Sequence, residues 1–183
     1  MNQELVTNLD PHMKVVPALV LDFDGTIRRS KTGQPFIKNF QDIELMPGIE
    51  KLIWRYRNLG WLILGISNQA GVAHGFKLPL EIENEMDATI RLFTENPFHI
   101  YKHCYHDGKG KIEPFNHRSL LRKPDIGMLA LMEKEAFDHK YVIDWDNSLF
   151  VGDRPEDEEC AKRAGIKFRH INSFLNEPHE FKI

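Results

Sequence analysis

Short apolar runs alternate along this chain with segments of helical periodicity, and this alternation limits the possible folds more than any other feature. We expect strands at 18–23, 61–66, 98–103, 148–151 and 167–171, and helices at 47–60, at 80–95, from 124 onward and at 156–164. Strands that alternate with helices are typical of βαβ units. The sequence therefore predicts the α/β fold class with a central parallel sheet.

The chain is about as long as one domain. It has 183 residues, and single domains usually contain about 100–200. Residues 1–14 show neither helical nor strand periodicity, so we expect a flexible N-terminal arm there and a single domain over 15–183.

Composition excludes several classes of protein. The net charge of −3 argues against a dedicated nucleic-acid coat. Apolar runs stay below the ~18–20 residues that cross a bilayer, so we expect no membrane contact. Two cysteines make no disulfide framework, which favours a reducing, cytoplasmic location. Nothing in the sequence indicates an obligate protein partner.

Polar clusters come directly after several predicted strands. They are Asp22 with Asp24, Ser67 with Asn68, and Asp153 with Asp157. In parallel sheets, ligands bind outside the carboxyl ends of the strands. We therefore expect these side chains to converge at one edge of the sheet.

The pair Asp22 and Asp24 suits a metal-assisted reaction. Two neighbouring carboxylates repel each other unless a cation or a shared proton intervenes, and Mg²⁺ prefers oxygen ligands. One carboxylate can then act as nucleophile and the other as general acid and base. The alternative is an aspartate that caps the next turn, which the whole string DFDGT at 22–26 disfavours.

The remaining clusters suit a phosphate group. The Ser67 hydroxyl, neighbouring backbone N–H groups and the Lys123 ammonium at a predicted helix start can bind phosphate oxygens. Asp153 and Asp157 can complete a metal site. Taken singly, each has a plain alternative: a polar turn, a solvated lysine, or an aspartate that caps a helix.

The order of these strings resembles a known superfamily. DFDGT (22–26), SNQ (67–69), RKP (122–124) and GDRPED (152–157) are similar to the haloacid dehalogenase (HAD) superfamily of phosphohydrolases. SNQ and RKP resemble its subfamily IIIA, the branch of histidinol phosphatase, heptose bisphosphate phosphatase and polynucleotide 3′-phosphatase. The resemblance implies a Rossmann-like three-layer α/β/α fold, Mg²⁺ and a phospho-aspartyl intermediate.

The resemblance also implies a role for each matching residue. Asp22 would be the nucleophile and a Mg²⁺ ligand. Asp24 would be the general acid and base and would bind the metal through its backbone carbonyl, with Thr26 helping to orient its side chain. Asp153 and Asp157 would bind or support the metal.

Four further residues would bind the phosphate or the substrate. They are Ser67, Asn68, Arg122 and Lys123. The segments between Asp24, Ser67 and Lys123 are already filled by predicted elements, so we expect no large cap domain. An open site would admit a phosphorylated sugar, another small metabolite or a nucleic-acid end.

The loop at 104–121 helps to distinguish the groups of phosphatases within subfamily IIIA. In the heptose and histidinol phosphatases a Cys-x-His pair and two later cysteines bind zinc, but Ser119 and Leu121 occupy the later cysteine positions here. The remaining candidate zinc ligands are Cys104, His106 and His117, with His103 as a spare. We favour a basic loop with scattered histidines over a structural Zn²⁺ site.

That departure keeps polynucleotide 3′-phosphatase as an alternative. The segments 30–36, 77–79 and 146–153 resemble that group, and Arg28, Arg29 and Lys31, together with the basic residues of 102–123, suit a basic rim for a polyanion. On that basis Arg28→Ala is expected to change only substrate preference. The alternative is that these basic residues attract any small phosphorylated substrate or are simply solvated. A catalytically silent phosphate-binding module is the alternative of another class. The presence of Asp22, Asp24, Lys123 and Asp153 together argues against it.

Overall fold

The computed structural model describes residues 11–176. Its core is a parallel five-stranded sheet with strand order β6-β5-β2-β8-β9. The strands are β2 (Ala18–Asp22), β5 (Leu62–Asn68), β6 (Ile100–Cys104), β8 (Leu149–Gly152) and β9 (Lys167–His170). The predicted α/β class is confirmed.

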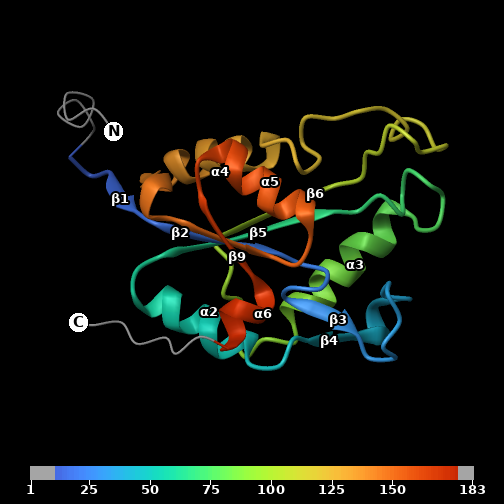
Figure 1. Ribbon diagram of the computed structural model, residues 1–183, viewed down its shortest axis with the longest axis horizontal. Helices are drawn as coiled ribbons and strands as arrows, with labels where there is room; N and C mark the ends of the chain where they lie inside the picture. The colour runs from blue at the N-terminus through green and yellow to red at the C-terminus, as the bar shows by residue number, and fades with distance from the viewer. Residues whose placement is uncertain (1–10, 177–183) are drawn as a thin grey trace.

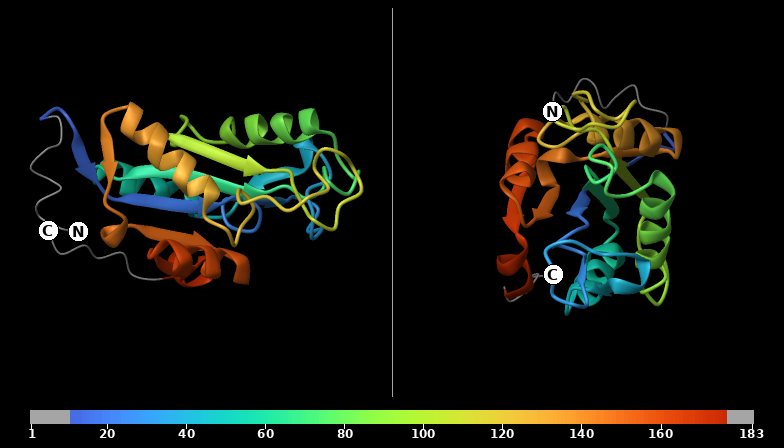
Figure 2. Two further views of the ribbon diagram at one scale, coloured as in Figure 1. Left: turned by 90° about the horizontal axis from the view of Figure 1, so that it is seen from above. Right: turned by 90° about the vertical axis from the view of Figure 1, so that its right-hand side faces the viewer.

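Helices cover both faces of this sheet (Figure 1). On one face lie α2 (Ile49–Asn58), α3 (Pro79–Ile90) and α6 (Ile171–Asn176), and on the other α4 (Gly127–Asp138) and α5 (Pro155–Ala164). Figure 2 shows the same three layers from two further directions. The fold is thus the predicted three-layer α/β/α arrangement.

The central strand shows why the layers form. All five residues of β2 are buried, as a parallel strand with helices on both faces requires. Leu19 and Leu21 belong to the core under α2 and α3, whereas Ala18 and Val20 belong to the core under α4 and α5. Successive side chains point to opposite faces, so one short apolar run supplies both cores.

Two predicted helices differ from the observed ones by three residues or more at one end. Helix α3 ends at Ile90 instead of 95, because the chain turns there to bury Phe93, whose ring packs edge-on against Phe98 at 5.7 Å. Helix α4 begins at Gly127 instead of 124, because residues 119–126 form hydrogen-bonded turns first, including Gly127 N–H to Leu120 C=O.

Several short elements were not predicted. Strand β1 (Lys14–Val16) pairs in parallel with β7 (Tyr141–Ile143), and 3₁₀ turns span Phe40–Asp42 (η1) and Trp145–Asn147 (η2). Helix α6 follows β9 directly. Of the predicted arm at 1–14, residues 1–10 lie outside the described residues, while Lys14 already belongs to β1.

The loops that leave the carboxyl ends of the strands carry the remaining features. A small antiparallel hairpin of β3 (Arg28–Ser30) and β4 (Ile43–Leu45) follows β2. Residues 105–126 form a long loop after β6 at the same end of the sheet (Figure 1). Within residues 11–176 there is no helix long and apolar enough to cross a membrane.

Candidate active site

A buried lysine joins two buried aspartates at the carboxyl edge of the sheet. The Lys123 ammonium donates a hydrogen bond to Asp22 Oδ1, and its Nζ lies 2.6 Å from Asp157 Oδ1. All three side chains are almost fully buried. Burial alone lowers the pKa of Lys123, but Asp22 and Asp157 together raise it above its ordinary value, so the lysine stays charged.

The chain positions each of these groups locally. Asp22 is the last residue of β2. Asp157 lies in the first turn of α5, where its Oδ2 accepts from the backbone N–H groups of Asp153 and Arg154 at 3.2 and 3.1 Å. Asp157 Oδ2 therefore caps the start of the helix, whereas Asp157 Oδ1 pairs with Lys123.

Lys123 itself is held by Asn68. The Asn68 side chain accepts from the Lys123 backbone N–H and donates to its C=O, both at 3.0 Å. The prediction that a helix N-terminus lies at Lys123 is wrong, because α4 begins four residues later. A reciprocal amide pair from the end of β5 positions the lysine instead.

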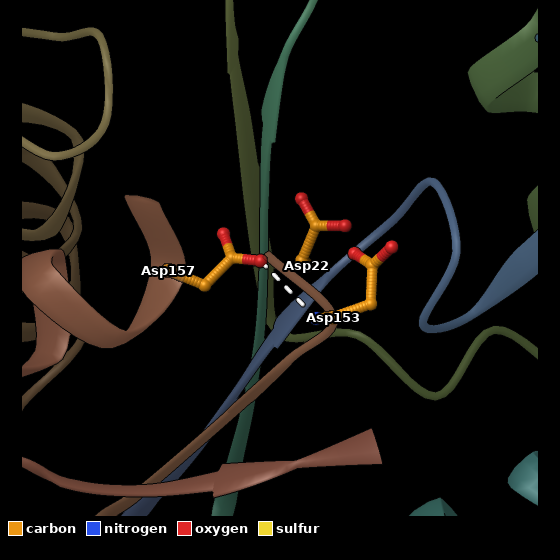
Figure 3. A group of neighbouring side chains, drawn as sticks. All are labelled: Asp22, Asp153 and Asp157. Atoms are coloured by element: carbon orange, nitrogen blue, oxygen red, sulfur yellow. Dashed lines mark hydrogen bonds between the residues drawn. The ribbon is translucent and has the colours of Figure 1, made fainter. Parts of the chain in front are cut away.

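Asp153 joins the first two aspartates in an acidic cluster (Figure 3). Ligand oxygens of Asp22, Asp153 and Asp157 all lie within 4.8 Å of one another. Asp153 Oδ1 is buried and has no hydrogen-bond partner among the described residues. Burial raises the pKa of Asp22 and of Asp153, although Lys123 opposes the rise at Asp22.

This cluster fits a hard divalent cation. Three carboxylates share one buried ammonium, an oxygen-only donor set suits Mg²⁺, and a bound cation would relieve their repulsion. Gly25 leaves space for the Asp153 carboxylate. It has φ of +93°, and a Cβ there would lie 2.2 Å from Asp153 Oδ2. Only glycine meets both demands at this position.

Asp24 points to a different set of partners. Its Oδ1 accepts from Arg28 Nε at 2.8 Å, and its Oδ2 accepts from Gln69 Nε2 at 2.6 Å and from Ser67 Oγ at 3.5 Å. Burial raises its pKa, but the Arg28 guanidinium and the Gln69 amide outweigh burial and hold that pKa below its ordinary value. The Asp24 carboxylate is not part of the acidic cluster.

The prediction that Arg28 belongs to a basic rim is wrong. Its side chain is 0% exposed, with Nη1 donating to Glu85 C=O at 3.0 Å and to Thr89 Oγ1 at 2.8 Å. Its guanidinium also lies 5.6 Å from the centre of the Phe23 ring. The expectation that Arg28→Ala affects substrate preference alone therefore does not follow from where the side chain lies.

Two other predicted residues have surroundings that differ from those expected. Thr26 is fully buried, and its hydroxyl has no hydrogen-bond partner among the described residues, so no contact links it to the Asp24 side chain. Arg122 lines the cleft, where its guanidinium donates to His106 C=O and lies 3.3 Å from Asp107 Oδ2.

A cleft of about 900 Å³ opens over these groups. Asp22, Asp24, Ser67, Lys123 and Asp153 line its floor, with Asn68 and Arg122 beside them. Phe36 and Phe76, which are 75% and 82% exposed, line it as well. The cleft therefore combines a charged floor with aromatic side chains that face solvent.

The structure does not gather the candidate zinc ligands. Among residues 11–176 the three aspartates are the sole group of three possible ligands that lie close enough together. His106 and His117 are neighbours, with ring centres 4.4 Å apart, but Cys104 is buried at the end of β6 and does not join them. Burial raises the pKa of the Cys104 thiol, which disfavours the thiolate that zinc needs.

Sequence reasoning gave no role to Gln69 or Glu85. Gln69 belongs to the SNQ string that carried the resemblance, yet only Ser67 and Asn68 received roles. Glu85 falls on the buried face of α3 with Ile82, Met86 and Thr89. A charged residue on the apolar stripe of an amphipathic helix was the signal for a buried partner.

Comparison with known proteins decides the family. Residues 18–174 match the family model described as polynucleotide kinase 3 phosphatase. The chain belongs to this family. It is a phosphatase of the HAD superfamily, in subfamily IIIA, as the motifs predicted.

Curated relatives of this family member include heptose bisphosphate phosphatases. A D-glycero-alpha-D-manno-heptose-1,7-bisphosphate 7-phosphatase of Photorhabdus laumondii is 31% identical over 158 residues, which cover 85% of this chain and 81% of that protein. A D-glycero-beta-D-manno-heptose-1,7-bisphosphate 7-phosphatase of Escherichia coli K12 is 30% identical over 156 residues, which cover 84% and 77%.

Solved structures of HAD-like phosphatases share the fold. One from Mesorhizobium loti superposes with a TM-score of 0.69 and 29% identity, covering 82% of this chain and 69% of that one. The D,D-heptose 1,7-bisphosphate phosphatase of B. bronchiseptica, solved with magnesium and phosphate, superposes with a TM-score of 0.64 and 24% identity, covering 85% and 79%. The second likeness concerns the fold alone.

Proposed function

We propose that this phosphatase is a Mg²⁺-dependent phosphomonoester hydrolase that forms a phospho-aspartyl intermediate on Asp22. The observation that carries the proposal is the buried group of Lys123, Asp22 and Asp157, of which Lys123 and Asp22 line the cleft. Asp22 lies at the cleft, and its negative charge is partly balanced by an ammonium that can also face an incoming phosphoryl group.

The acidic cluster would hold the metal. Asp22, Asp153 and Asp157 offer carboxylate oxygens, and the backbone carbonyl of Asp24 is a further candidate. A bound Mg²⁺ supplies positive charge that lets an anionic nucleophile meet an anionic substrate.

Asp22 and Asp24 divide the proton and phosphoryl chemistry between them. An Asp22 oxygen attacks phosphorus while the bond to the leaving oxygen breaks, and protonated Asp24 gives that oxygen its proton. Asp24 then takes a proton from water, whose oxygen attacks phosphorus and releases Asp22 and inorganic phosphate. The ionised Asp24 held by Arg28 and Gln69 is the form that the second step uses.

The remaining floor residues would bind the phosphoryl group. Ser67 and Lys123 would hold its oxygens, with Asn68 fixing the lysine backbone. Arg122 also lines the cleft and would contact the substrate there. Thr26 has no contact that supports a direct role.

The substrate class we favour is a phosphorylated sugar, which the names of the curated relatives support. The second candidate is a nucleic-acid 3′-phosphate, which the family model's description and the exposed Phe36 and Phe76 rings support. Exposed aromatic rings beside basic groups are typical of sites that stack nucleobases. Comparing kcat/KM for heptose 1,7-bisphosphate, histidinol phosphate and a 3′-phosphorylated oligonucleotide separates the two candidates.

The mechanism is tested with p-nitrophenyl phosphate. We expect turnover with Mg²⁺, loss of turnover in excess EDTA, and essentially no turnover by Asp22→Asn with or without metal. Trapping of labelled phosphate on the wild-type protein but not on Asp22→Asn would locate the intermediate. Undiminished turnover after chelation, or in Asp22→Asn, would contradict the mechanism, and a wild-type protein that binds phosphate without turnover would favour the silent module.

A further inference from the structure

A network of side chains around Arg28 holds Asp24, whose carboxylate is not part of the acidic cluster. Arg28 is its centre: Nε donates to Asp24 Oδ1 at 2.8 Å, and Nη1 donates to Thr89 Oγ1 at 2.8 Å and to Glu85 C=O at 3.0 Å. Thr89 in turn donates to Glu85 C=O at 2.7 Å. The hairpin that follows β2 is thereby tied to helix α3.

The network is balanced in charge. Both Glu85 carboxylate oxygens accept from Lys77 Nζ, at 2.6 and 2.8 Å, and Glu85 Oε2 lies 4.0 Å from Arg28 Nη2. Two carboxylates, of Asp24 and Glu85, thus face two cations, of Arg28 and Lys77. No net charge remains to attract a metal, so the network serves something other than metal binding.

Its geometry fixes the orientation of one carboxylate. Arg28 binds Oδ1 of Asp24, and Gln69 binds Oδ2 at 2.6 Å. Arg28 has little freedom of its own, because it is fully buried, is bonded to α3 and packs over Phe23. A carboxylate that accepts from a fixed donor at each of its two oxygens cannot rotate. A group that transfers a proton needs such a fixed orientation in order to meet its target.

We propose that Arg28, held by Thr89 and Glu85, is a positioning residue that aims Asp24 at the leaving oxygen of the substrate. This inference rests on the proposed acid and base role of Asp24. If Arg28 aims Asp24, the loss of activity on disturbing Arg28 should depend on the leaving group of the substrate. An alkoxide must be protonated as it leaves, whereas p-nitrophenolate is stable without a proton. Misaiming Asp24 therefore slows the release of an alcohol far more than that of p-nitrophenol.

The experiment compares kcat/KM for glycerol 2-phosphate and for p-nitrophenyl phosphate, because kcat/KM covers the steps up to departure of the leaving group. In Arg28→Lys, which keeps the charge and loses the fork of donors, we expect a fall of about 10–100-fold for glycerol 2-phosphate and less than about 3-fold for p-nitrophenyl phosphate. Thr89→Val removes the acceptor that orients Arg28 together with the Thr89 hydrogen bond to Glu85 C=O, and we expect the same selectivity change at about 3–10-fold.

Glu135→Gln is the matched control. It breaks the pair of Glu135 with Lys102, and neither residue lines the cleft. We expect the ratio of the two kcat/KM values to stay at the wild-type value in this variant. Equal losses for both substrates in Arg28→Lys and Thr89→Val would show a merely structural role and overturn the proposal. Should Arg28→Lys fail to fold by circular dichroism, Thr89→Val alone decides.

Failure of the positioning role is distinguishable from failure of the proposed function. If the phospho-aspartyl mechanism is wrong, Asp22→Asn keeps its turnover of p-nitrophenyl phosphate. If only the positioning role is wrong, Asp22→Asn is inactive while Arg28→Lys and Thr89→Val show an unchanged preference between the two substrates.

Discussion

Two buried groups of charged side chains meet at the end of β2, and they differ in charge balance. In the first, Lys123 pairs with Asp22 and Asp157, and Asp153 lies beside them. In the second, Arg28 and Lys77 pair with Asp24 and Glu85. We call them the Lys123 group and the Arg28 group. The motif aspartates 22 and 24 are two residues apart, yet each belongs to a different group.

The difference in charge indicates that the Lys123 group binds a ligand, whereas the Arg28 group positions Asp24. The Lys123 group has three carboxylates and one ammonium, a formal balance of −2, whereas the Arg28 group has two of each, a balance of 0. A deficit of two positive charges in a buried place is costly unless a divalent cation supplies them. The neutral Arg28 group needs no ligand and is suited to hold Asp24 in place.

The largest effect is expected from removing the cation of the Lys123 group. In Lys123→Met the phosphoryl group loses a buried charged donor, and kcat/KM for p-nitrophenyl phosphate should fall by about 10²–10³-fold at saturating Mg²⁺. Lys102→Met, which removes the lysine of a part-exposed pair with Glu135, should stay near the wild-type value. Wild-type kcat/KM in Lys123→Met would refute the charged role of the group.

The sequence was sufficient to predict the Lys123 group but not the Arg28 group. Asp22 and Asp153 follow predicted strands at the carboxyl edge of a parallel sheet, so topology alone brings them together. Lys123 shows the limit of that reasoning, because the inferred helix dipole is not there and the Asn68 amide pair does the positioning.

Arg28 shows what sequence could not predict. Three basic residues at 28–31 look like a solvated run, and only Arg28 turns inward. Its burial depends on Glu85 and Thr89, which are more than 50 residues later and share a face of α3. Such a pairing arises from tertiary packing, so local pattern gives the helix face but not its partner.

A metal should stabilise the protein through the Lys123 group alone. At a Mg²⁺ concentration of 100 times Kd, binding to the native state adds about 2.7 kcal/mol, which corresponds to a rise in Tm of about 5–11 °C for a chain of this length. We expect Asp153→Asn to lose most of this rise by differential scanning fluorimetry.

The control for the metal effect lies on the surface. Asp138 pairs with Lys134 on the exposed side of α4, and Asp138→Asn should keep the full rise in Tm. An equal rise in wild type and Asp153→Asn would mean that Mg²⁺ binds elsewhere, and the charge deficit of the Lys123 group would then need another explanation.

The smallest effect is expected where the cationic partners of a carboxylate lie nearer to solvent. Asp107 Oδ2 lies 3.3 Å from both His74 Nε2 and Arg122 Nη2, whose side chains are 29% and 28% exposed, against 2% for Lys123 and 0% for Arg28. The Lys109 backbone N–H and the Arg122 guanidinium lower the pKa of Asp107, against an opposing effect of burial. Solvent screening should limit its contribution to less than about 1 kcal/mol.

The pH dependence of stability shows whether ionised Asp107 stabilises or destabilises the folded protein. A carboxyl whose pKa is lower in the folded state stabilises the protein above its unfolded pKa of about 3.9, and this stabilisation is lost as pH falls further through the folded pKa. Asp107→Asn should therefore lower the free energy of unfolding in urea at pH 7, and the gap to wild type should narrow below about pH 4. If the difference in free energy of unfolding instead widens in acid, the folded protein disfavours the ionised form of Asp107. Exposure would then not distinguish this cluster from the Lys123 and Arg28 groups.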